Sequence, residues 1–204
     1  ARYVDGLANA VVARGGIVHE NTRVTALRHR GGGIEARTAQ GRVRAGHAIV
    51  ATLSPAVDPT VTFARTSPQR AYGMATATDV EVATDHAYAV GPSTRSTRRV
   101  IDQDGTPLLV VVGSSHRTGA AVDPAGHLEA LVEHARRHWG AGEVRYHWSA
   151  QDHLSHDGLP LVGGLSRRSK VLVATGAAKW GLTLGTAAAI DLTEAIVYVR
   201  QLRP

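Results

Sequence analysis

The sequence predicts an α+β fold, with helices and short strands at both ends of the chain and an antiparallel sheet in its middle. Three observations support this class. Apolar residues repeat at helical spacing in three stretches, glycine turns separate short β-rich segments, and residues 57–113 contain alternating and apolar runs typical of an antiparallel sheet. With 204 residues, of which 43% are hydrophobic, the chain is long enough for one domain or two small ones.

The N-terminal part is predicted to form one helix followed by a series of strands. Residues 3–14 place Val4, Leu7 and Val11 on one helical face, and Gly15-Gly16 is a suitable helix end because glycine enters the left-handed region without strain. Glycine turns then separate the strands. The strands are expected at residues 17–20, 22–29, 33–38, 42–45 and 47–52, the last of them buried and ended by Ser54-Pro55.

The middle and C-terminal parts are predicted to contain the sheet and two further helices. Asp123-Pro124 is a favourable helix start, with aspartate as the N-cap and proline as the first helical residue, and Gly140 ends that helix. A last helix begins near Thr183 and carries an apolar face as far as Val199. Strands are expected at residues 72–82, 86–90, 108–112, 143–148 and 171–175.

Composition excludes several kinds of site. The chain has no cysteine, so it holds no disulfide or thiolate metal site, which fits a reducing, cytoplasmic location. No run approaches the roughly 18 apolar residues of a membrane span. The net charge is +6, but the arginines are scattered along the sequence and aromatic residues make up only 4%. This favours a solvated surface over nucleic-acid binding, which usually needs a basic patch or a base-stacking platform.

The segment most informative about function is residues 171–185, which combine a buried strand, a glycine-rich loop and the start of a helix. Glycines allow backbone N–H groups to approach a ligand closely, and a helix N-terminus adds unpaired donors and partial positive charge. Such a site can hold an anion, or an oxygen that becomes negative during a reaction. The alternative is an ordinary strand–loop–helix joint, in which the glycines only ease the turn.

Several blocks occur in a fixed order along the chain. The C-terminal blocks are Trp148-Ser-Ala-Gln-Asp152, Asp157-Gly-Leu-Pro-Leu-Val-Gly163, Ala174-Thr-Gly176 and Trp180-Gly-Leu-Thr-Leu-Gly-Thr-Ala-Ala-Ala189. Earlier blocks include Gly15-Gly-Ile-Val-His-Glu-Asn-Thr-Arg-Val24 and Ala48-Ile-Val-Ala-Thr52. Together they resemble FAD-dependent oxidoreductases of the D-amino-acid oxidase, glycine oxidase and sarcosine oxidase type. The C-terminal blocks are similar to a bacterial subgroup, of which some members are fused to a Rieske domain.

The resemblance implies a partial, Rossmann-like FAD-binding domain that lacks its first βαβ unit, formed by residues 1–55 and 141–204. Residues 56–140 would form a substrate domain with an antiparallel sheet and a helix. The family's opening Gly-x-Gly-x-x-Gly turn, which holds the FAD pyrophosphate, does not occur in this sequence. The sequence is therefore expected to be the C-terminal portion of a longer flavoenzyme and inactive alone, with the missing N-terminal segment of the same protein completing the FAD site.

The resemblance also implies a set of cofactor contacts. Backbone donors at the start of the last helix would reach the edge of the flavin that becomes negative on reduction. The residues expected at the flavin are Gly176, Trp180, Gly181, Leu182 and Thr183. Those expected at the adenine, ribose and pyrophosphate end are Val24, Ala51 and Thr52.

The expected substrate is a small amine or amino-acid-like molecule that is oxidised at a C–N bond. In the resembled amino-acid oxidases, an arginine shortly before the Asp-Gly-x-Pro block holds the substrate carboxylate, but residues 151–156 contain no arginine. A plain α-amino acid is therefore an unfavourable substrate, unless another arginine compensates. The weaker candidates for substrate contact are Arg98, Arg99, His116 and Trp148, and no general base is assigned.

Other readings of the polar residues receive less support. Residues His147, Asp152, His153, His156 and Asp157 match no common zinc signature and are interpreted as a solvated polar loop, so no metal site is predicted. The serines and histidine of residues 113–116 do not form the Gly-x-Ser-x-Gly motif of a hydrolase. The rival function is a non-catalytic binding or structural module that keeps this half of the fold alone.

Overall fold

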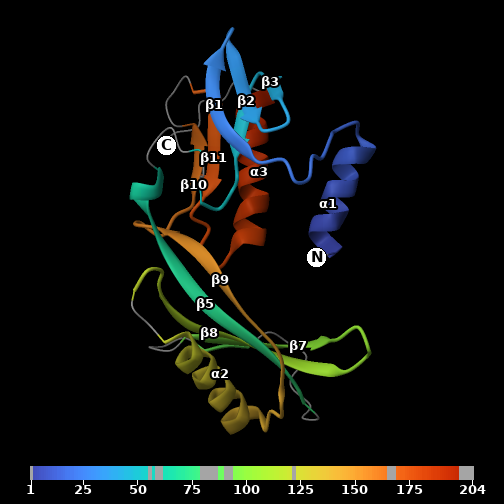
Figure 1. Cartoon of the computed structure of the whole chain (residues 1–204), viewed down its shortest axis with the longest axis vertical. Coiled ribbons are helices and arrows are strands. Elements are labelled where there is room, and N and C mark those ends of the chain that lie inside the picture. Colours follow the sequence, from blue (N-terminus) through green and yellow to red (C-terminus); the bar gives the residue numbers. More distant parts are fainter. Residues whose placement is uncertain are drawn as a thin grey trace.

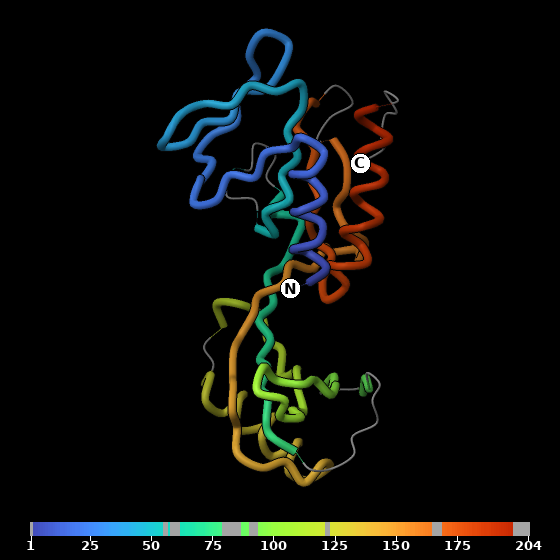
Figure 2. The backbone as a smooth tube through the Cα atoms, turned by 90° about the vertical axis from the view of Figure 1, so that its right-hand side faces the viewer, coloured from blue at the N-terminus to red at the C-terminus, as the bar shows by residue number. Residues whose placement is uncertain are grey.

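A computed structural model describes residues 2–54, 57, 62–78, 87–89, 94–120, 123–164 and 169–197 (Figure 1). Two long strands, β5 (Thr66–Ala77) and β9 (Val144–Ser155), run from one lobe of the molecule into the other, and the two lobes are separate in the tube view (Figure 2). The upper lobe in Figure 1 contains both ends of the described chain, and the lower lobe contains its middle. The strand residues predicted at 79–82, 86 and 90, together with Pro55 and Val199, lie outside the described residues.

The N-terminal helix forms as predicted, but the first expected strand does not. Helix α1 (Arg2–Ala13) ends where Gly15 takes a φ of 81°. Residues 17–20, predicted as a strand, are not in a strand in the structure, so this prediction is wrong. Ile17 is 76% exposed, and no neighbouring strand pairs with this segment in the described part of the chain, so apolar β-branched residues alone do not make it a strand.

A three-stranded antiparallel sheet follows, as the glycine turns predicted. It contains β1 (Val24–Arg30), β2 (Gly33–Thr38) and β3 (Arg42–Ala45) in that order. The turn between β1 and β2 needs two residues with positive φ, and Gly31 and Gly32 adopt 55° and 78°. One face of this sheet contributes Ile34 and Leu27 to a small core with Val50 and Val171.

A parallel strand pair joins segments that lie far apart in the sequence. Strand β4 (Ala48–Val50) pairs in parallel with β11 (Val171–Thr175), and β10 (Leu161–Gly164) pairs antiparallel on the other side of β11. Helix α3 (Gly181–Val197) follows β11 directly and begins two residues earlier than predicted. Its buried residues, Ala188 and Leu192, lie on the predicted apolar face.

The lower lobe is a five-stranded antiparallel sheet with one helix on it. The strand order is β6 (Ala87–Ala89), β7 (Arg95–Ile101), β8 (Pro107–Arg117), β5 and β9, and a short 3-10 turn (Thr62–Arg65) precedes β5. Helix α2 (Pro124–Trp139) has the predicted caps, because the Asp123 carboxylate accepts from Ala125 N and Gly140 adopts the left-handed conformation. The main core lies between α2 and one face of this sheet and contains Tyr72, Met74, Leu109, Val111, Leu131 and Ala135.

Strand β9 is longer than the strand predicted at residues 143–148, and it pairs with β5 along almost its whole length. The sequence-based boundary at residue 140 grouped this segment with residues 1–55, whereas the hydrogen-bonded register places it in the five-stranded sheet. Pairing with a twelve-residue strand extends β9, which local sequence alone does not reveal. The division into a cofactor-binding and a substrate domain stays a prediction.

Candidate functional site

The glycine-rich loop predicted as a ligand site lies at the junction of β11 and α3. Gly176 and Ala178 have positive φ values of 74° and 49°, and the loop is anchored to β9 by the hydrogen bond from Ala178 N to His153 O. The first turn of α3 is closed by hydrogen bonds from Trp180 N to Ala177 O and from Leu184 N to Trp180 O. The segment is therefore a fixed turn that delivers a helix N-terminus to the surface.

The amides at the start of α3 are available to a ligand. In the described part of the chain, no hydrogen bond involves the N–H groups of Gly181, Leu182 or Thr183, and all three residues are exposed. A Cβ built on Gly181 would meet nothing within 4 Å, so the space above it is open. Figure 1 shows this end of α3 directed toward the five-stranded sheet. Three unpaired donors and the positive end of a 17-residue helix therefore face the region between the two lobes.

A cavity of about 520 Å³ lies between this loop and the five-stranded sheet. The loop contributes Lys179 and Trp180, and the sheet contributes Tyr88, Ser96, Arg98, Val110 and Val112. The Lys179 ammonium is 2.9 Å from the Asp152 carboxylate, whereas the Arg98 side chain has no ion-pair partner among the described residues. The cavity thus combines an apolar wall, two aromatic rings and, as far as the structure describes the chain, one cation without a partner that can bind an anionic group.

Neighbouring arginines on β7 point to opposite faces of the sheet. Ser96 and Arg98 pair with Val112 and Val110, which line the cavity, whereas Arg99 pairs with Leu109, which belongs to the core under α2. Because successive strand residues alternate between faces, Arg99 lies on the α2 side. The structure therefore separates two residues that the sequence analysis treated as equivalent.

The Trp148 side chain lies over Gly73 on the cavity side of the sheet. The two residues are paired across β5 and β9, and a Cβ at Gly73 would collide with the indole ring. Gly73 shares its face with Ala75, which packs with Val110. Trp148 is therefore on the same face as Arg98, although it is not among the residues that line the cavity.

His116 lies on the opposite side, in a stack of rings beneath α2. Its ring centroid is 4.8 Å from that of His127 and 5.7 Å from that of Tyr72, whose hydroxyl is 3.1 Å from His116 Nε2. His116 Nδ1 lies 2.9 Å from Arg117 O, and since a carbonyl only accepts, Nδ1 is the donor. Nε2 of the neutral ring is then the acceptor for Tyr72. This position does not bring His116 to the cavity.

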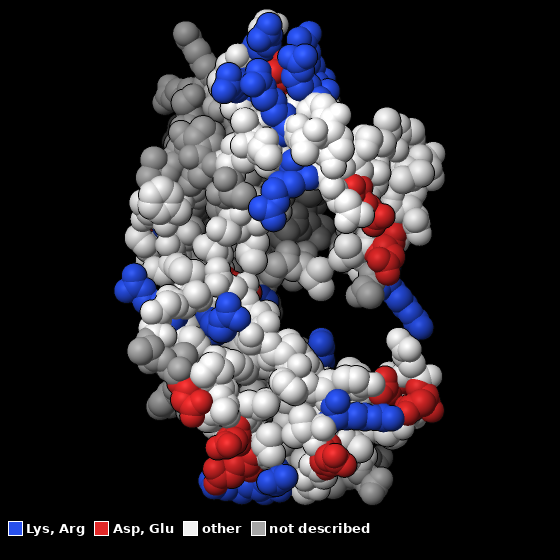
Figure 3. Space-filling view, in the orientation of Figure 1, with Lys and Arg blue, Asp and Glu red and all other residues white. Residues whose placement is uncertain are grey.

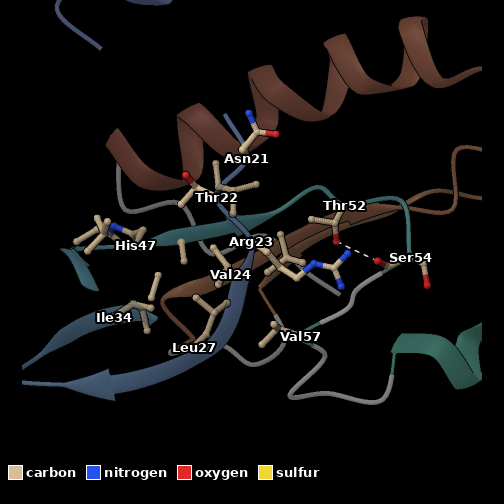
Figure 4. A pocket seen from close by; sticks show the side chains of 16 residues that line it. Asn21, Thr22, Arg23, Val24, Leu27, Ile34, His47, Thr52, Ser54 and Val57 are labelled. Atoms are coloured by element: carbon tan, nitrogen blue, oxygen red, sulfur yellow. Dashed lines mark hydrogen bonds between the residues drawn. The ribbon is translucent and has the colours of Figure 1, made fainter. Parts of the chain in front are cut away.

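A second cavity, of about 860 Å³, lies between the three-stranded sheet and β4 (Figure 4). Val24 and Thr52, predicted at the adenine end of the cofactor, both line it, and Ala51 does not. Its wall is largely apolar, with Leu27, Ile34 and Val43 among its residues. Figure 4 shows the Arg23 guanidinium directed toward Thr52 and Ser54, where Thr52 Oγ1 donates a 3.1 Å hydrogen bond to Ser54 O.

The polar residues around position 152 form strand and turn contacts, not the solvated loop that the sequence suggested. His153 is only 5% exposed, and its ring nitrogens lie 3.2 Å from Thr66 Oγ1 and 3.3 Å from Gln151 Nε2. Asp157 accepts from Leu159 N, which lowers the pKa of its carboxyl group. The interpretation as a loop is wrong for His153 and Asp152, because pairing of β9 with β5 buries one and brings the other to Lys179.

Sequence reasoning did not identify Lys179, Tyr88 or Ser96 as site residues. Lys179 directly precedes the resembled block that begins at Trp180, so its position was a usable signal. Ser96 is two residues from Arg98, and strand alternation would have placed both on one face. No local signal marks Tyr88, because its strand β6 is short and lies beside the cavity only as a result of its pairing with β7.

The chain is similar to one protein family, to a curated protein and to several solved structures. A family model described as "FAD dependent oxidoreductase" matches residues 1–195. A Bacillus subtilis (strain 168) protein named "Putative Rieske 2Fe-2S iron-sulfur protein YhfW" is 27% identical over 198 residues, which cover 96% of this chain and 38% of that protein. Glycine oxidase from Geobacillus kaustophilus superposes with a TM-score of 0.75 at 20% identity, covering 97% of this chain and 56% of that one. Iminodiacetate oxidase from Chelativorans sp. BNC1 gives 0.69 at 18% identity, covering 96% and 54%.

These matches define the fold and the extent of the likeness. The chain spans about half the length of these solved structures and less than half of the curated relative. At this level of identity, the solved structures show a shared fold and do not identify a substrate. No helix among the described residues is long and apolar enough to cross a membrane.

Proposed function

Because this chain belongs to the FAD-dependent oxidoreductase family, we propose that it provides the flavin-ring end and the substrate face of an enzyme that oxidises an amine or amino-acid-like molecule at a C–N bond. The observation that carries this proposal is the open N-terminus of α3. Its three amides, unpaired among the described residues, adjoin a cavity that contains an exposed tryptophan and Arg98, for which the described part of the chain offers no partner. An ordinary strand–loop–helix joint would have the same unpaired amides, because every helix leaves its first N–H groups without intrahelical partners. The cavity with Arg98 and Trp180 beside them is what favours a ligand site.

The residues at the start of α3 fit the flavin. We assign Gly176, Trp180, Gly181, Leu182 and Thr183 to this part of FAD, which when bound supplies the acceptor for a hydride from the substrate. The amides of residues 181–183 would stabilise negative charge on an oxygen of the ring, since a helix N-terminus favours anions. The absence of a side chain at Gly181 leaves room for close approach of a planar ring.

The larger cavity fits the other end of the cofactor. Its volume of about 860 Å³ lies within the usual range for small-molecule sites, roughly 300–1,000 Å³, and its apolar wall suits a nucleobase. We assign Val24 and Thr52 to this end, with Ala51 in the same backbone segment. Thr52 would act through polar groups at the cavity rim, where Arg23 also lies.

On the substrate side we assign Arg98 in preference to Arg99 and His116, because only Arg98 faces the cavity. Its guanidinium would hold an anionic group of the substrate through paired hydrogen bonds. Trp148 extends the apolar face of the sheet beside it. Lys179 is held by Asp152, so its charge is largely compensated and it would position Trp180 and the loop.

The phosphate-binding part of the cofactor site is proposed to come from another segment of the same protein. The chain contains no Gly-x-Gly-x-x-Gly turn, and β4 lies at an edge of its sheet. Apolar side chains of the same lobe are exposed, including Ile49 on β4, Leu7 and Val11 on α1 and Ile190 on α3. A covering segment would bury these groups and supply the missing turn. The cytoplasmic and bacterial assignments stay predictions.

Anaerobic reduction of the complete protein tests the function. Bleaching of the flavin absorbance by a primary or secondary amine, and not by the matching alcohol, is the expected result. Bleaching by alcohols alone would contradict C–N oxidation. A complete protein that binds no flavin would instead favour the second candidate, a non-catalytic binding module. The missing phosphate-binding turn is consistent with such a module.

A further inference from the structure

One face of the three-stranded sheet carries five arginines around a single glutamate. In the strand register, Arg28 and Arg44 lie opposite Glu35, and Arg42 lies opposite Arg37. Paired residues share a face, so these side chains, together with Arg30 two residues beyond Arg28, project from the same side. We call this surface the arginine face; it consists of Arg28, Arg30, Arg37, Arg42 and Arg44.

Most of the positive charge on this face is not neutralised. The Glu35 side chain is 1% exposed, and its carboxylate lies 3.2 Å from Arg37 Nε, 3.3 Å from Arg44 Nε and 4.0 Å from Arg30 Nε. In the described part of the chain, the side chains of Arg28 and Arg42 form no hydrogen bond or ion pair. Figure 3 shows the result as a dense basic surface over β1–β3, with a small acidic spot at its centre.

Glu35 holds this surface in a conformation suited to a second anion. Each of its three contacts is made through the arginine Nε atom, and the side chains of Arg30 and Arg44 are 61% and 69% exposed. A guanidinium whose stem is fixed loses less conformational freedom on binding, and its planar fork pairs well with a carboxylate. The Glu35 carboxylate therefore orients the arginines of this face, and their side chains remain available to bind a further anion.

We propose that the arginine face docks an extended acidic segment of a protein partner. Arg28 and Arg30, like Arg42 and Arg44, are two residues apart on one strand, a repeat of about 6.6 Å, and alternate carboxylates of an extended acidic peptide have the same repeat. The three strands together are only about 10 Å wide, so the arginine face is narrow. A nucleic-acid interface usually buries roughly 600 Å² or more. No aromatic side chain lies on this face to stack on a base.

Fluorescence anisotropy of the complete protein with a labelled peptide of alternating glutamate and serine tests this proposal. The double variant Arg28→Ala/Arg42→Ala removes two cations that form no hydrogen bond or ion pair among the described residues, and it leaves the hydrogen-bond partners of Glu35, Arg37 and Arg44, in place. We expect it to weaken peptide binding about tenfold, as two modest ion pairs would. Arg28→Lys/Arg42→Lys should recover part of the loss, and Arg117→Ala/Arg136→Ala, which removes the same charge elsewhere, should bind as the unmodified protein does.

Two further probes, duplex DNA and vesicles of anionic lipid, are measured at the same salt concentration. Tighter binding of either probe than of the peptide would overturn the proposal in favour of a nucleic-acid or membrane surface. Equal weakening in the Arg117/Arg136 control would show a net-charge effect only, and an absence of peptide binding at low salt would also overturn it. Circular dichroism of each variant establishes that the sheet is intact.

Discussion

At the scale of single residues, the face on which an arginine lies decides its role. Arg98 and Arg99 are adjacent, yet one lines the cavity and the other points toward the core under α2. A substrate contact is therefore open only to the first. The same distinction separates Trp148 from His116, since both lie in the five-stranded sheet and only Trp148 is on the cavity side.

The complete protein should oxidise glycine and simple D-amino acids poorly, because the proposed anion contact, Arg98, comes from β7 and not from the segment that holds the carboxylate in the resembled oxidases. The segment where the resembled oxidases hold the substrate carboxylate contains Asp152, which is bound to Lys179. Loss of a charge-assisted pair costs about 2–5 kcal/mol when the other charge stays buried, which corresponds to roughly a 30-fold to several-thousand-fold loss in kcat/KM. Steady-state kinetics would measure this.

The matched pair Arg98→Ala and Arg99→Ala identifies the remaining anion contact. For any acidic substrate, Arg98→Ala should raise KM, while Arg99→Ala should leave KM nearly unchanged. Efficient oxidation of D-alanine or glycine that neither substitution affects would show that the carboxylate is held elsewhere, and the assignment of Arg98 would fail.

Glu35 should make the free energy of unfolding depend on pH in the acidic range. Hydrogen bonding from Arg37 is the main cause that lowers the pKa of Glu35, with Arg44 adding to it against the opposing effect of burial. A lowered pKa in the folded state means that the stabilisation is present above the ordinary glutamate range, about pH 4 to 5, and is lost as pH falls through the lowered pKa. Glu35→Gln should unfold at lower urea concentration near neutral pH and lose less stability on acidification. Parallel urea curves at every pH would contradict this.

At the scale of elements, the start of α3 links fold to function. Gly181→Val should impair flavin binding or flavin reduction in the complete protein while sparing the fold. A Cβ at this position meets nothing within 4 Å, so the fold should tolerate a side chain there, but that side chain would occupy the space that a ring needs. Gly41→Val, in an equally open turn far from this loop, is the control. Normal flavin content and reduction in Gly181→Val would remove the flavin assignment from this helix end.

Helix α2 depends on its N-cap. Asp123→Ala removes the acceptor for Ala125 N, which lies 3.0 Å from the carboxylate, and should cost about 1 kcal/mol of unfolding free energy. Asp123→Asn keeps an acceptor at this position and should lose only a fraction of that amount. Urea denaturation of the three proteins measures the difference. Equal losses in both variants would show that charge, not capping, is responsible.

At the scale of the whole molecule, both ends of the proposed cofactor site lie in the upper lobe, and the proposed substrate face lies in the lower lobe. The flavin end is built by α3 and the loop before it, whereas the cavity at β4 has no phosphate-binding turn beside it in this chain. Both lobes are connected by β5 and β9 (Figure 2), so their relative position rests on two continuous strands. These two strands therefore hold the proposed substrate face in position relative to the start of α3.

The 204-residue chain alone should bind FAD weakly or not at all. The phosphate-binding turn normally anchors the most charged part of the cofactor, and its hydrogen bonds are absent without it. Titration of the purified chain with FAD, followed by flavin fluorescence, gives the affinity. Yellow protein with stoichiometric FAD would contradict both this prediction and the proposal that another segment completes the site.

The sequence by itself determined the local elements and the family. Helical periodicity and capping residues predicted α1, α2 and α3, and glycine pairs predicted the turns, because these signals act within a few residues of one another. The ordered blocks in residues 148–189 identified the type of flavoenzyme, and the junction at residues 176–181 lies where they placed it. The missing strand at residues 17–20 shows the limit of this reasoning, since an apolar segment becomes a strand only when another strand pairs with it.

Only the tertiary structure decided which distant residues meet. The parallel pair β4–β11, the length of β9, the ion pair of Lys179 with Asp152 and the gathering of scattered arginines around Glu35 all depend on strand register. Alternation along a strand shows which side chains share a face, but not which face turns toward a neighbour. That choice is made by packing between elements: helix α2 covers the face that contains Arg99, and the loop before α3 adjoins the face that contains Arg98.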